Sequence, residues 1–223
     1  MTITYHDDVI QGSEEWAAMR CGLLTASEMH LIITPTLKIA SNEKERTHLY
    51  ELLAQRVTQY VEPRYIGDDM LRGMDEEIEA VAMYELHYAP VDRVGFITND
   101  KWGFTIGYSP DALVGDDGLV ECKSRRAKFQ VQTICDGVLP PEFLLQVQTG
   151  LLVSERAWLD FISYCGGLPM YVMRCYPELE VQEAIVFAAT EFEGRLARNM
   201  EQYLFASRDL HKTERKIIED MHL

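Results

Sequence analysis

The stretch Gly107–Lys128 reads GYSPDALVGDDGLVECKSRRAK and is the centre around which the chain is organised. Two short runs of β-forming residues flank a Gly-Asp-Asp-Gly turn signal, which predicts a β-hairpin. Asp111 precedes the turn, and Glu121 and Lys123 follow it. Carboxylate oxygens are hard ligands for divalent metals, and a nearby lysine can orient a water molecule or offset negative charge. The hairpin is therefore our candidate for the catalytic centre.

The register of this hairpin decides whether the three side chains can act together. Glu121 and Lys123 share one face because side chains alternate along a strand. A three-residue turn, Gly115–Asp117, pairs Asp111 with Glu121, whereas a two-residue turn puts Asp111 on the other face. Gly118 is compatible with the three-residue turn, which needs a residue in the left-handed region. From this spacing alone, an exposed structural hairpin is the favoured interpretation.

The composition of the chain suits one α/β or α+β domain, because 223 residues are enough for an ample core. The N-terminus lacks the apolar segment of a signal peptide, and no apolar run reaches the roughly 18 residues of a membrane helix. We therefore expect a soluble, cytoplasmic protein with no membrane partner. The five cysteines are scattered without a C-x-x-C pair, which favours reduced thiols over disulfides or a zinc site.

The net charge limits how the chain could bind nucleic acid. Against 36 acidic residues there are 21 lysines and arginines, so the formal net charge is −15. Such a surface repels a polyanion over most of its area. Binding to DNA would require a confined basic track, metal ions at the acidic site, and a strong dependence on salt.

The order of predicted elements is helices, a β-meander, a helix, a hairpin and a long helix. Capping residues start three helices, after Ser13, at the capping box Thr25–Glu28, and after Asn42. We predict one domain, 1–223, in which a central mixed β-sheet is flanked by helices. The predicted segments are a helical part over about 1–90, the sheet and active site over about 91–176, and a C-terminal helix within about 180–223.

Other segments offer side chains that could join the hairpin. Glu77 provides a further carboxylate on the predicted helix before it. Arg20 and Ser27 stand beside a helix N-terminus, which is a natural cradle for phosphate. Ser109 lies two residues before Asp111, and Gln146 lies on the predicted helix after the hairpin.

Each of these side chains also has a structural interpretation. Arg20 could cap the C-terminus of its own helix, and Glu77 could belong to a solvated acidic face. Thr25 and Glu28 are accounted for by the capping box, so we assign them no chemistry. Gln148 is evenly balanced between the two interpretations, because residues two apart on a helix point away from each other. Two tryptophans are interpreted as packing residues rather than base platforms, Trp16 and Trp102.

Taken together, the residues resemble the phage lambda exonuclease type of viral recombination nuclease, within the restriction-endonuclease-like PD-(D/E)xK superfamily. The resemblance extends over about 16–164. It rests on five motifs that occur in the same order as in the family and with similar spacing. The motifs are W-x-x-x-R-x-G-x-x-T-A-S-E at Trp16–Glu28, G-x-x-x-E at Gly73–Glu77, S-P-D at Ser109–Asp111, E-x-K at Glu121–Lys123 and Q-V-Q at Gln146–Gln148. The chain after about Tyr176 matches less clearly.

The resemblance implies a restriction-endonuclease-like fold and a metal site. It implies that Asp111 and Glu121 bind the catalytic metal with help from the Cys122 backbone carbonyl. Glu77 would hold a second metal or its waters, as in a two-metal displacement. Magnesium is the expected ion, with Mn²⁺ as a substitute, because the ligands are hard oxygens.

The same resemblance implies roles for the remaining site residues. Lys123 would position or deprotonate the attacking water, and Gln146 would line the site. Arg20 and Ser27, with Ser109 assisting, would hold the terminal 5′-phosphate of the DNA. Met70, just before the helix segment that carries Glu77, is a candidate apolar wedge between the strands.

The implied activity is 5′→3′ digestion of one strand of linear double-stranded DNA to mononucleotides. This leaves 3′ single-stranded overhangs for a single-strand annealing protein in phage-type recombination, inside a bacterial host. Relatives form ring-shaped homotrimers, which would let basic residues face a DNA channel. The alternatives are an endonuclease of the same superfamily and, less favoured, a non-catalytic DNA-binding module. The candidate channel residues are Lys38, Lys44, Arg46, Arg125, Arg126 and Lys128.

Overall fold

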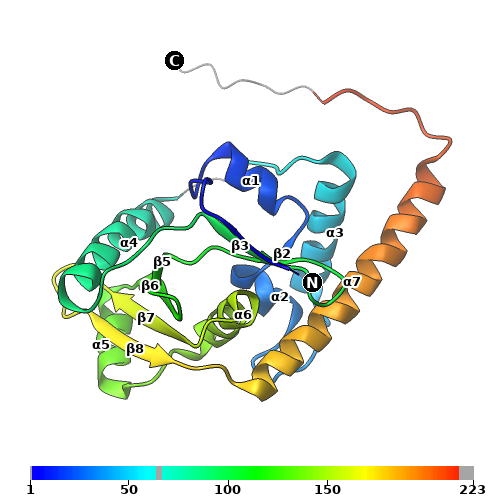
Figure 1. Cartoon of the computed structure of the whole chain (residues 1–223). Helices are drawn as coiled ribbons and strands as arrows, with labels where there is room; N and C mark the ends of the chain where they lie inside the picture. Colours follow the sequence, from blue (N-terminus) through cyan, green and yellow to red (C-terminus); the bar gives the residue numbers. More distant parts are fainter. Residues whose placement is uncertain (1, 64–66, 216–223) are drawn as a thin grey trace, which may run out of the picture.

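The β-strands lie in two mixed four-stranded sheets, with strand orders β1-β3-β4-β2 and β5-β6-β7-β8 (Figure 1). The computed structural model describes residues 2–63 and 67–215, without the side chains of residues 68–70. Within each sheet one pair of neighbouring strands is parallel, β2 with β4 and β6 with β7. The strands are β1 Ile3–His6, β2 Leu24–Thr25, β3 Phe96–Asn99, β4 Ile106–Tyr108, β5 Ala112–Val114, β6 Gly118–Ser124, β7 Trp158–Tyr164 and β8 Tyr171–Cys175.

The helices pack around and between these sheets. Two of them begin as predicted, because the Ser13 hydroxyl accepts a hydrogen bond from the Trp16 amide and the Asn42 side chain accepts one from the Glu45 amide. The α-helices are α1 Glu14–Arg20, α2 Met29–Ile32, α3 Glu43–Thr58, α4 Asp68–His87, α5 Ala127–Asp136, α6 Leu144–Ser154 and α7 Leu179–Ser207, with 3₁₀ turns η1 Ala26–Glu28 and η2 Pro141–Phe143.

The mixed α/β architecture is confirmed, and the structure differs from the sequence-based expectation at three local points. The part over 1–90 is not purely helical, because β1 and β2 lie in it. The Thr25 capping box does not form. The Thr25 side chain makes no cap hydrogen bond and instead donates to the Glu28 carboxylate, over 2.9 Å, so a 3₁₀ turn and the short α2 replace the predicted second helix. Helix α5 was not predicted at all.

Strands β6 and β7 bury side chains on both faces, which decides where the site lies. Leu119 and Phe161 belong to the large core cluster that also contains residues of α6 and α7. Val120 and Ile162, the next residues along, belong to a second cluster under α4. Because side chains alternate along a strand, Glu121 and Lys123 share the face of Leu119.

A hydrogen-bonded ion pair fixes α4 on the second face of this sheet. The hydroxyl of Tyr84, on α4, donates to the Asp160 carboxylate over 2.6 Å. Arg174 donates to both oxygens of the same carboxylate, over 2.9 and 2.8 Å, and stacks 3.6 Å above the Trp158 ring. Such bidentate, charge-assisted bonds are geometrically specific. They set the rotation of the helix that carries Glu77.

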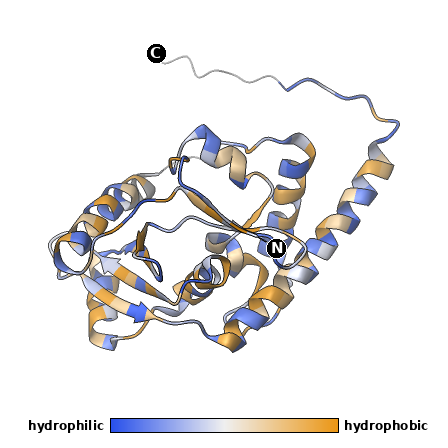
Figure 2. Cartoon of the chain, viewed as in Figure 1, coloured by the Kyte–Doolittle hydropathy of each residue, from blue (hydrophilic) through white to orange (hydrophobic). Residues whose placement is uncertain are grey.

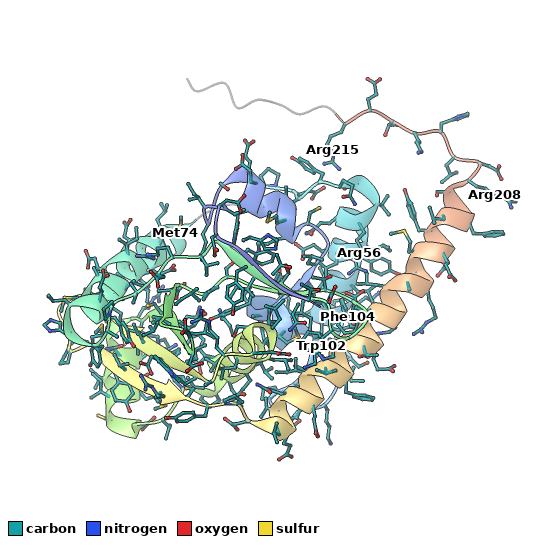
Figure 3. The ribbon with its side chains drawn as sticks, viewed as in Figure 1. Arg56, Met74, Trp102, Phe104, Arg208 and Arg215 are labelled. Atoms are coloured by element: carbon teal, nitrogen blue, oxygen red, sulfur yellow. The ribbon has the colours of Figure 1, made fainter. Side chains whose placement is uncertain are left out.

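Helix α7 is anchored by its N-terminal two thirds and projects from the body at its C-terminal end (Figure 1). Arg56, which Figure 3 labels on α3, makes two hydrogen bonds to the Glu193 carboxylate, over 2.7 and 2.6 Å, and one to the Gly22 carbonyl. Figure 2 shows hydrophilic and hydrophobic residues alternating along α7. None of the helices in the described residues combines the length and apolar character needed to cross a membrane.

Gly118 gives a test of the packing between β6 and β7. A methyl group at this position would overlap the ring of Trp158, whereas one at Gly73, on α4, would meet no neighbouring atom. We expect Gly118→Ala to lower the free energy of unfolding by roughly 1–3 kcal/mol. Gly73→Ala should raise it by up to about 1 kcal/mol, because alanine favours a helix over glycine. Urea denaturation measures both, and equal effects of the two variants would contradict the packing described here.

Candidate active site

The central hairpin has the register that a shared acidic site requires. Val114 pairs with Gly118 and Ala112 with Val120, so the turn is the three-residue turn 115–117. The Asp111 amide donates to the Val120 carbonyl over 3.1 Å, and the Asp111 carboxylate accepts a hydrogen bond from the Cys122 amide. Asp111 therefore lies against the 121–122 segment of β6.

The glycine that gives the turn its shape is not the one expected from the sequence. Gly115 adopts the left-handed conformation, with φ of 51°, whereas Gly118 is a regular residue of β6. Gly118 is needed for a different reason, namely the close approach of the Trp158 ring. The structure has the three-residue turn, one of the two alternatives that the sequence left open, and the left-handed residue is Gly115 rather than Gly118.

Glu121 is the most buried acid of the site, with 1% of its surface exposed, and three side chains donate to its carboxylate. The Lys123 ammonium donates to Oε1 over 2.7 Å, and the Gln146 amide donates to the same oxygen. The Tyr108 hydroxyl donates to Oε2 over 2.8 Å. The structure thus brings three of the expected residues together and adds Tyr108, which the sequence analysis missed.

Negative charge is concentrated around Asp111. Burial raises the pKa of the Asp111 carboxyl well above its usual value, and the charges of Glu121 and Glu77 raise it further, against the opposing effects of Lys123 and the Cys122 amide. Burial lowers the pKa of Lys123, but the charges of Glu121 and Asp111 outweigh it, so this pKa lies above its ordinary value. Three carboxyls thus face one ammonium, and a divalent cation would relieve the repulsion that raises the pKa of Asp111.

The donors available to such a cation are oxygens. Among the described residues, no group of three or more His, Cys, Asp or Glu side chains converges closely enough to hold a metal ion. The expected donors, the side chains of Asp111 and Glu121 and the Cys122 carbonyl, are all oxygens, and water would complete the shell, as Mg²⁺ prefers. The Cys122 thiol packs in the apolar cluster under α4, on the opposite face of β6 from Glu121, so it is not placed as a ligand. Glu77, on α4, acts on Asp111 through its charge.

A second cluster joins the three residues expected to bind phosphate. The indole Nε1 of Trp16 donates to the Ser109 hydroxyl over 2.8 Å, and the Arg20 guanidinium lies 4.3 Å above the Trp16 ring. Arg20 also donates to the Thr25 hydroxyl over 3.3 Å, and that hydroxyl lies 3.3 Å from the hydroxyl of the exposed Ser27. Trp16 and Thr25 hold the cluster together, although the sequence analysis assigned them to packing and capping.

Gln148 and two acids on the same helix as Glu77 have structural partners. Gln148 is buried, donates to the Tyr176 carbonyl over 2.9 Å, and accepts from the Glu178 amide over 2.8 Å, so it anchors the start of α7. Glu76 accepts a hydrogen bond from Ser124, and Glu79 accepts one from Tyr164. The acidic face of α4 is therefore partly engaged with β6 and β7.

The candidate channel residues lie in two groups, and the candidate wedge cannot be placed with either. The side chain of Met70 lies outside the described residues, and its neighbour Met74, labelled in Figure 3, is exposed on α4. The basic candidates fall in two separate regions of Figure 1. Lys38, Lys44 and Arg46 lie before and on α3, whereas Arg125, Arg126 and Lys128 lie at the start of α5.

Replacing Asp111 tests the charge balance of the site. Its pKa is raised above the value of about 3.9 in an unfolded chain, so the folded state binds more protons and loses stability as the pH rises between these two values. We expect Asp111→Asn, in EDTA, to be more stable than the original chain at pH 8, by roughly 1.4 kcal/mol per unit of pKa shift. The gain should vanish near pH 4 in urea denaturation, and the exposed Asp116→Asn should show no such pattern. A pH-independent difference would contradict the assignment.

Comparisons of sequence and fold with known proteins identify the family of this chain. The YqaJ-like viral recombinase domain matches residues 15–157. The crystal structure of the alkaline exonuclease LHK-Exo from Laribacter hongkongensis is 29% identical, with a TM-score of 0.79, and the match covers 89% of this chain and all of that one. LHK-Exo in complex with dAMP gives 30% identity and a TM-score of 0.80 over the same shares.

A phage-related exonuclease from Haemophilus somnus is 12% identical, with a TM-score of 0.57 over 80% of this chain and 96% of its own, and shares the fold alone. None of the curated proteins compared with this chain matches it. The family model covers more than half of the chain, and the solved relatives agree with it in fold. The chain therefore belongs to the family of YqaJ-like viral recombinase domains, and it has the restriction-endonuclease-like fold expected of viral recombination nucleases.

Proposed function

We propose that the chain is a metal-dependent exonuclease that digests one strand of linear double-stranded DNA in the 5′→3′ direction. The observation that carries the proposal is the segment 109–111. Ser109 belongs to the Arg20 cluster and Asp111 to the acidic site, so the proposed phosphate pocket and the proposed metal site are two residues apart. A pocket for the terminal phosphate beside the metal site gives the enzyme its direction along the strand.

The residues of the chain divide the work of hydrolysis. Asp111, Glu121 and the Cys122 carbonyl would hold a divalent ion, with Mg²⁺ expected and Mn²⁺ a substitute, which would supply Lewis acidity at the scissile phosphate. Lys123 remains an ammonium, because its pKa is raised by the neighbouring carboxylates. It therefore positions the attacking water and offsets negative charge rather than accepting a proton. Gln146 holds the Glu121 carboxylate in place.

The remaining site residues bind and orient the substrate. Arg20 is the cation of the phosphate pocket, and the hydroxyls of Ser27 and Ser109 lie beside it through the contacts with Trp16 and Thr25. Charge-assisted hydrogen bonds of this kind are the stronger ones, so the terminal phosphate would be held firmly. Glu77 contributes charge for a second ion or its waters.

The biological setting follows from the family and from the relatives. The relative LHK-Exo is an alkaline exonuclease whose structure has been solved with dAMP, a nucleoside monophosphate, which supports mononucleotides as the product here. We propose that the overhangs pass to a single-strand annealing protein during phage-type recombination in the bacterial cytoplasm. The chain has a formal net charge of −15. A homotrimeric ring fits this charge, because an acidic outer surface can enclose a basic channel.

A linear duplex phosphorylated at both 5′ ends, incubated with Mg²⁺, tests the activity. We expect 5′-mononucleotides as the product. A label at the 5′ end of a strand should be released before a label at its 3′ end, and closed circular DNA should stay intact. Lys123→Ala should abolish cleavage while DNA binding persists. Equal loss of label from 5′ and 3′ strand ends, or no release of nucleotides, would overturn the proposal, and cutting of closed circles would favour the endonuclease. Binding that does not depend on metal or on Asp111, without cleavage, would favour the non-catalytic module.

Arg20→Ala tests the phosphate pocket separately. We expect the preference for 5′-phosphorylated over 5′-hydroxyl ends to fall by roughly tenfold or more, since a hydrogen bond to a charged group contributes about 1.5–3 kcal/mol. Initial rates on the two substrates measure this preference. Arg198→Ala, at an exposed position of α7, is the matched control and should keep it. An unchanged ratio in Arg20→Ala, with a melting temperature near that of the original chain, would show that the pocket lies elsewhere.

A further inference from the structure

The row of side chains that forms the acidic site continues past the end of β6. Glu121, Lys123 and Arg125 are spaced two residues apart, so they lie on one face of the extended segment. The Arg125 amide donates to the Tyr164 carbonyl over 2.7 Å, which keeps this residue paired beside the end of β7. The row therefore leads from the metal site toward the start of α5.

Aromatic rings surround Arg125 at this point. Its guanidinium lies 5.0 Å from the centre of the Phe143 ring and 5.1 Å from that of Phe129, and only 11% of its side chain is exposed. Phe143 in turn packs on the buried Phe161, with 5.3 Å between ring centres. Arg125 is thus held rigidly, with one of its two aromatic neighbours fixed to the core.

Phe129 differs from Phe143 because it is open to solvent. Its exposed fraction is 39%, and the Lys128 ammonium lies 4.6 Å from the centre of its ring. An exposed aromatic ring with one fixed and one flexible cation beside it is the arrangement that binds single-stranded nucleic acid, because the ring stacks on a base and the cations contact phosphates.

The charge distribution favours the same ligand. Four of the 21 lysines and arginines of this acidic chain lie within residues 123–128. Lys123 is paired with Glu121, and Arg125 is paired with Glu142 over 2.9 Å, but Glu142 is 53% exposed and its pairing is screened by water. A phosphate can therefore compete for Arg125, while Lys128 reaches solvent beside the ring.

We propose that Phe129, with Arg125 and Lys128, is a stacking platform for single-stranded DNA next to the active site. The proposal rests on the proposed function, since the strand that the nuclease leaves undigested is the unpaired DNA at this place. One base stacks on the Phe129 ring and takes the place of the Lys128 ammonium, which turns to the adjoining phosphate. The platform holds the retained strand away from the metal site.

The test is binding of a labelled single-stranded oligonucleotide with a 5′-hydroxyl end, in EDTA, measured by fluorescence anisotropy. The missing 5′-phosphate leaves the Arg20 pocket unengaged, and EDTA prevents cleavage. We expect Phe129→Ala to weaken binding roughly 5- to 150-fold, as the loss of one stacked base does, and Phe129→Trp to retain it. Val131→Ala, an exposed apolar change on the same helix, is the matched control and should bind like the original chain.

The two charged neighbours give opposite expected results. Glu142→Gln should tighten binding, because it releases Arg125 from its carboxylate partner. Lys128→Gln should weaken binding and lower the slope of log K against log salt by about 0.7, the value for one phosphate contact on a single strand. Unchanged binding in Phe129→Ala would overturn the platform. Equal weakening by Val131→Ala would also overturn it and would identify α5 as a docking face for a protein.

The outcome can be separated from that of the proposed function. The nuclease assay on a linear duplex and the binding assay on a single strand use different substrates and different residues. Cleavage with the expected polarity, together with normal oligonucleotide binding by Phe129→Ala, would remove the platform alone. Oligonucleotide binding that depends on Phe129, together with no cleavage of any duplex, would remove the nuclease alone.

Discussion

The structure depends on one buried carboxylate, that of Glu121. Its three donors come from three different elements, Tyr108 at the end of β4, Lys123 on β6 itself and Gln146 on α6. Because β4 and β6 belong to different sheets, these bonds join the two halves of the fold at the site. A buried charge that loses a partner is strongly destabilising, so the position of each donor is constrained by the same acid.

This arrangement makes the site a product of the fold rather than of one loop. The segment 109–111 connects β4, in one sheet, with β5, in the other, and carries both a hydroxyl of the proposed phosphate pocket and a carboxylate of the proposed metal site. Any movement of one sheet relative to the other changes the distance between the two subsites. Helix α4 is held against the sheet β5-β6-β7-β8, on the face opposite Glu121. The Tyr84 hydroxyl on α4 donates to Asp160, which is paired with Arg174.

Much of this could be predicted from the sequence, and the misses have physical causes. The caps at Ser13 and Asn42 are local patterns that specify their structure directly, whereas the sequence left the length of the hairpin turn open between two alternatives. Helix α5 was missed because its apolar residues do not form a buried stripe. Only Gln130 and Thr133 are buried in it, and residues 127–131 alternate as a strand would. Tyr108 could not be assigned, since its role arises from an acid on another sheet.

The approach of α6 to Tyr108 has a consequence for how this protein can change. A methyl group at Gly150 would lie 2.7 Å from the Tyr108 ring, so the ring that supports Glu121 occupies the space where a side chain would be. Glycine in the middle of a helix costs about 1 kcal/mol relative to alanine, and most helices are free to recover it. Here the substitution would displace the phenol from the carboxylate. We therefore expect α6 to keep its glycine and the low helix propensity that comes with it, because a stabilising alanine at this position would disrupt the site.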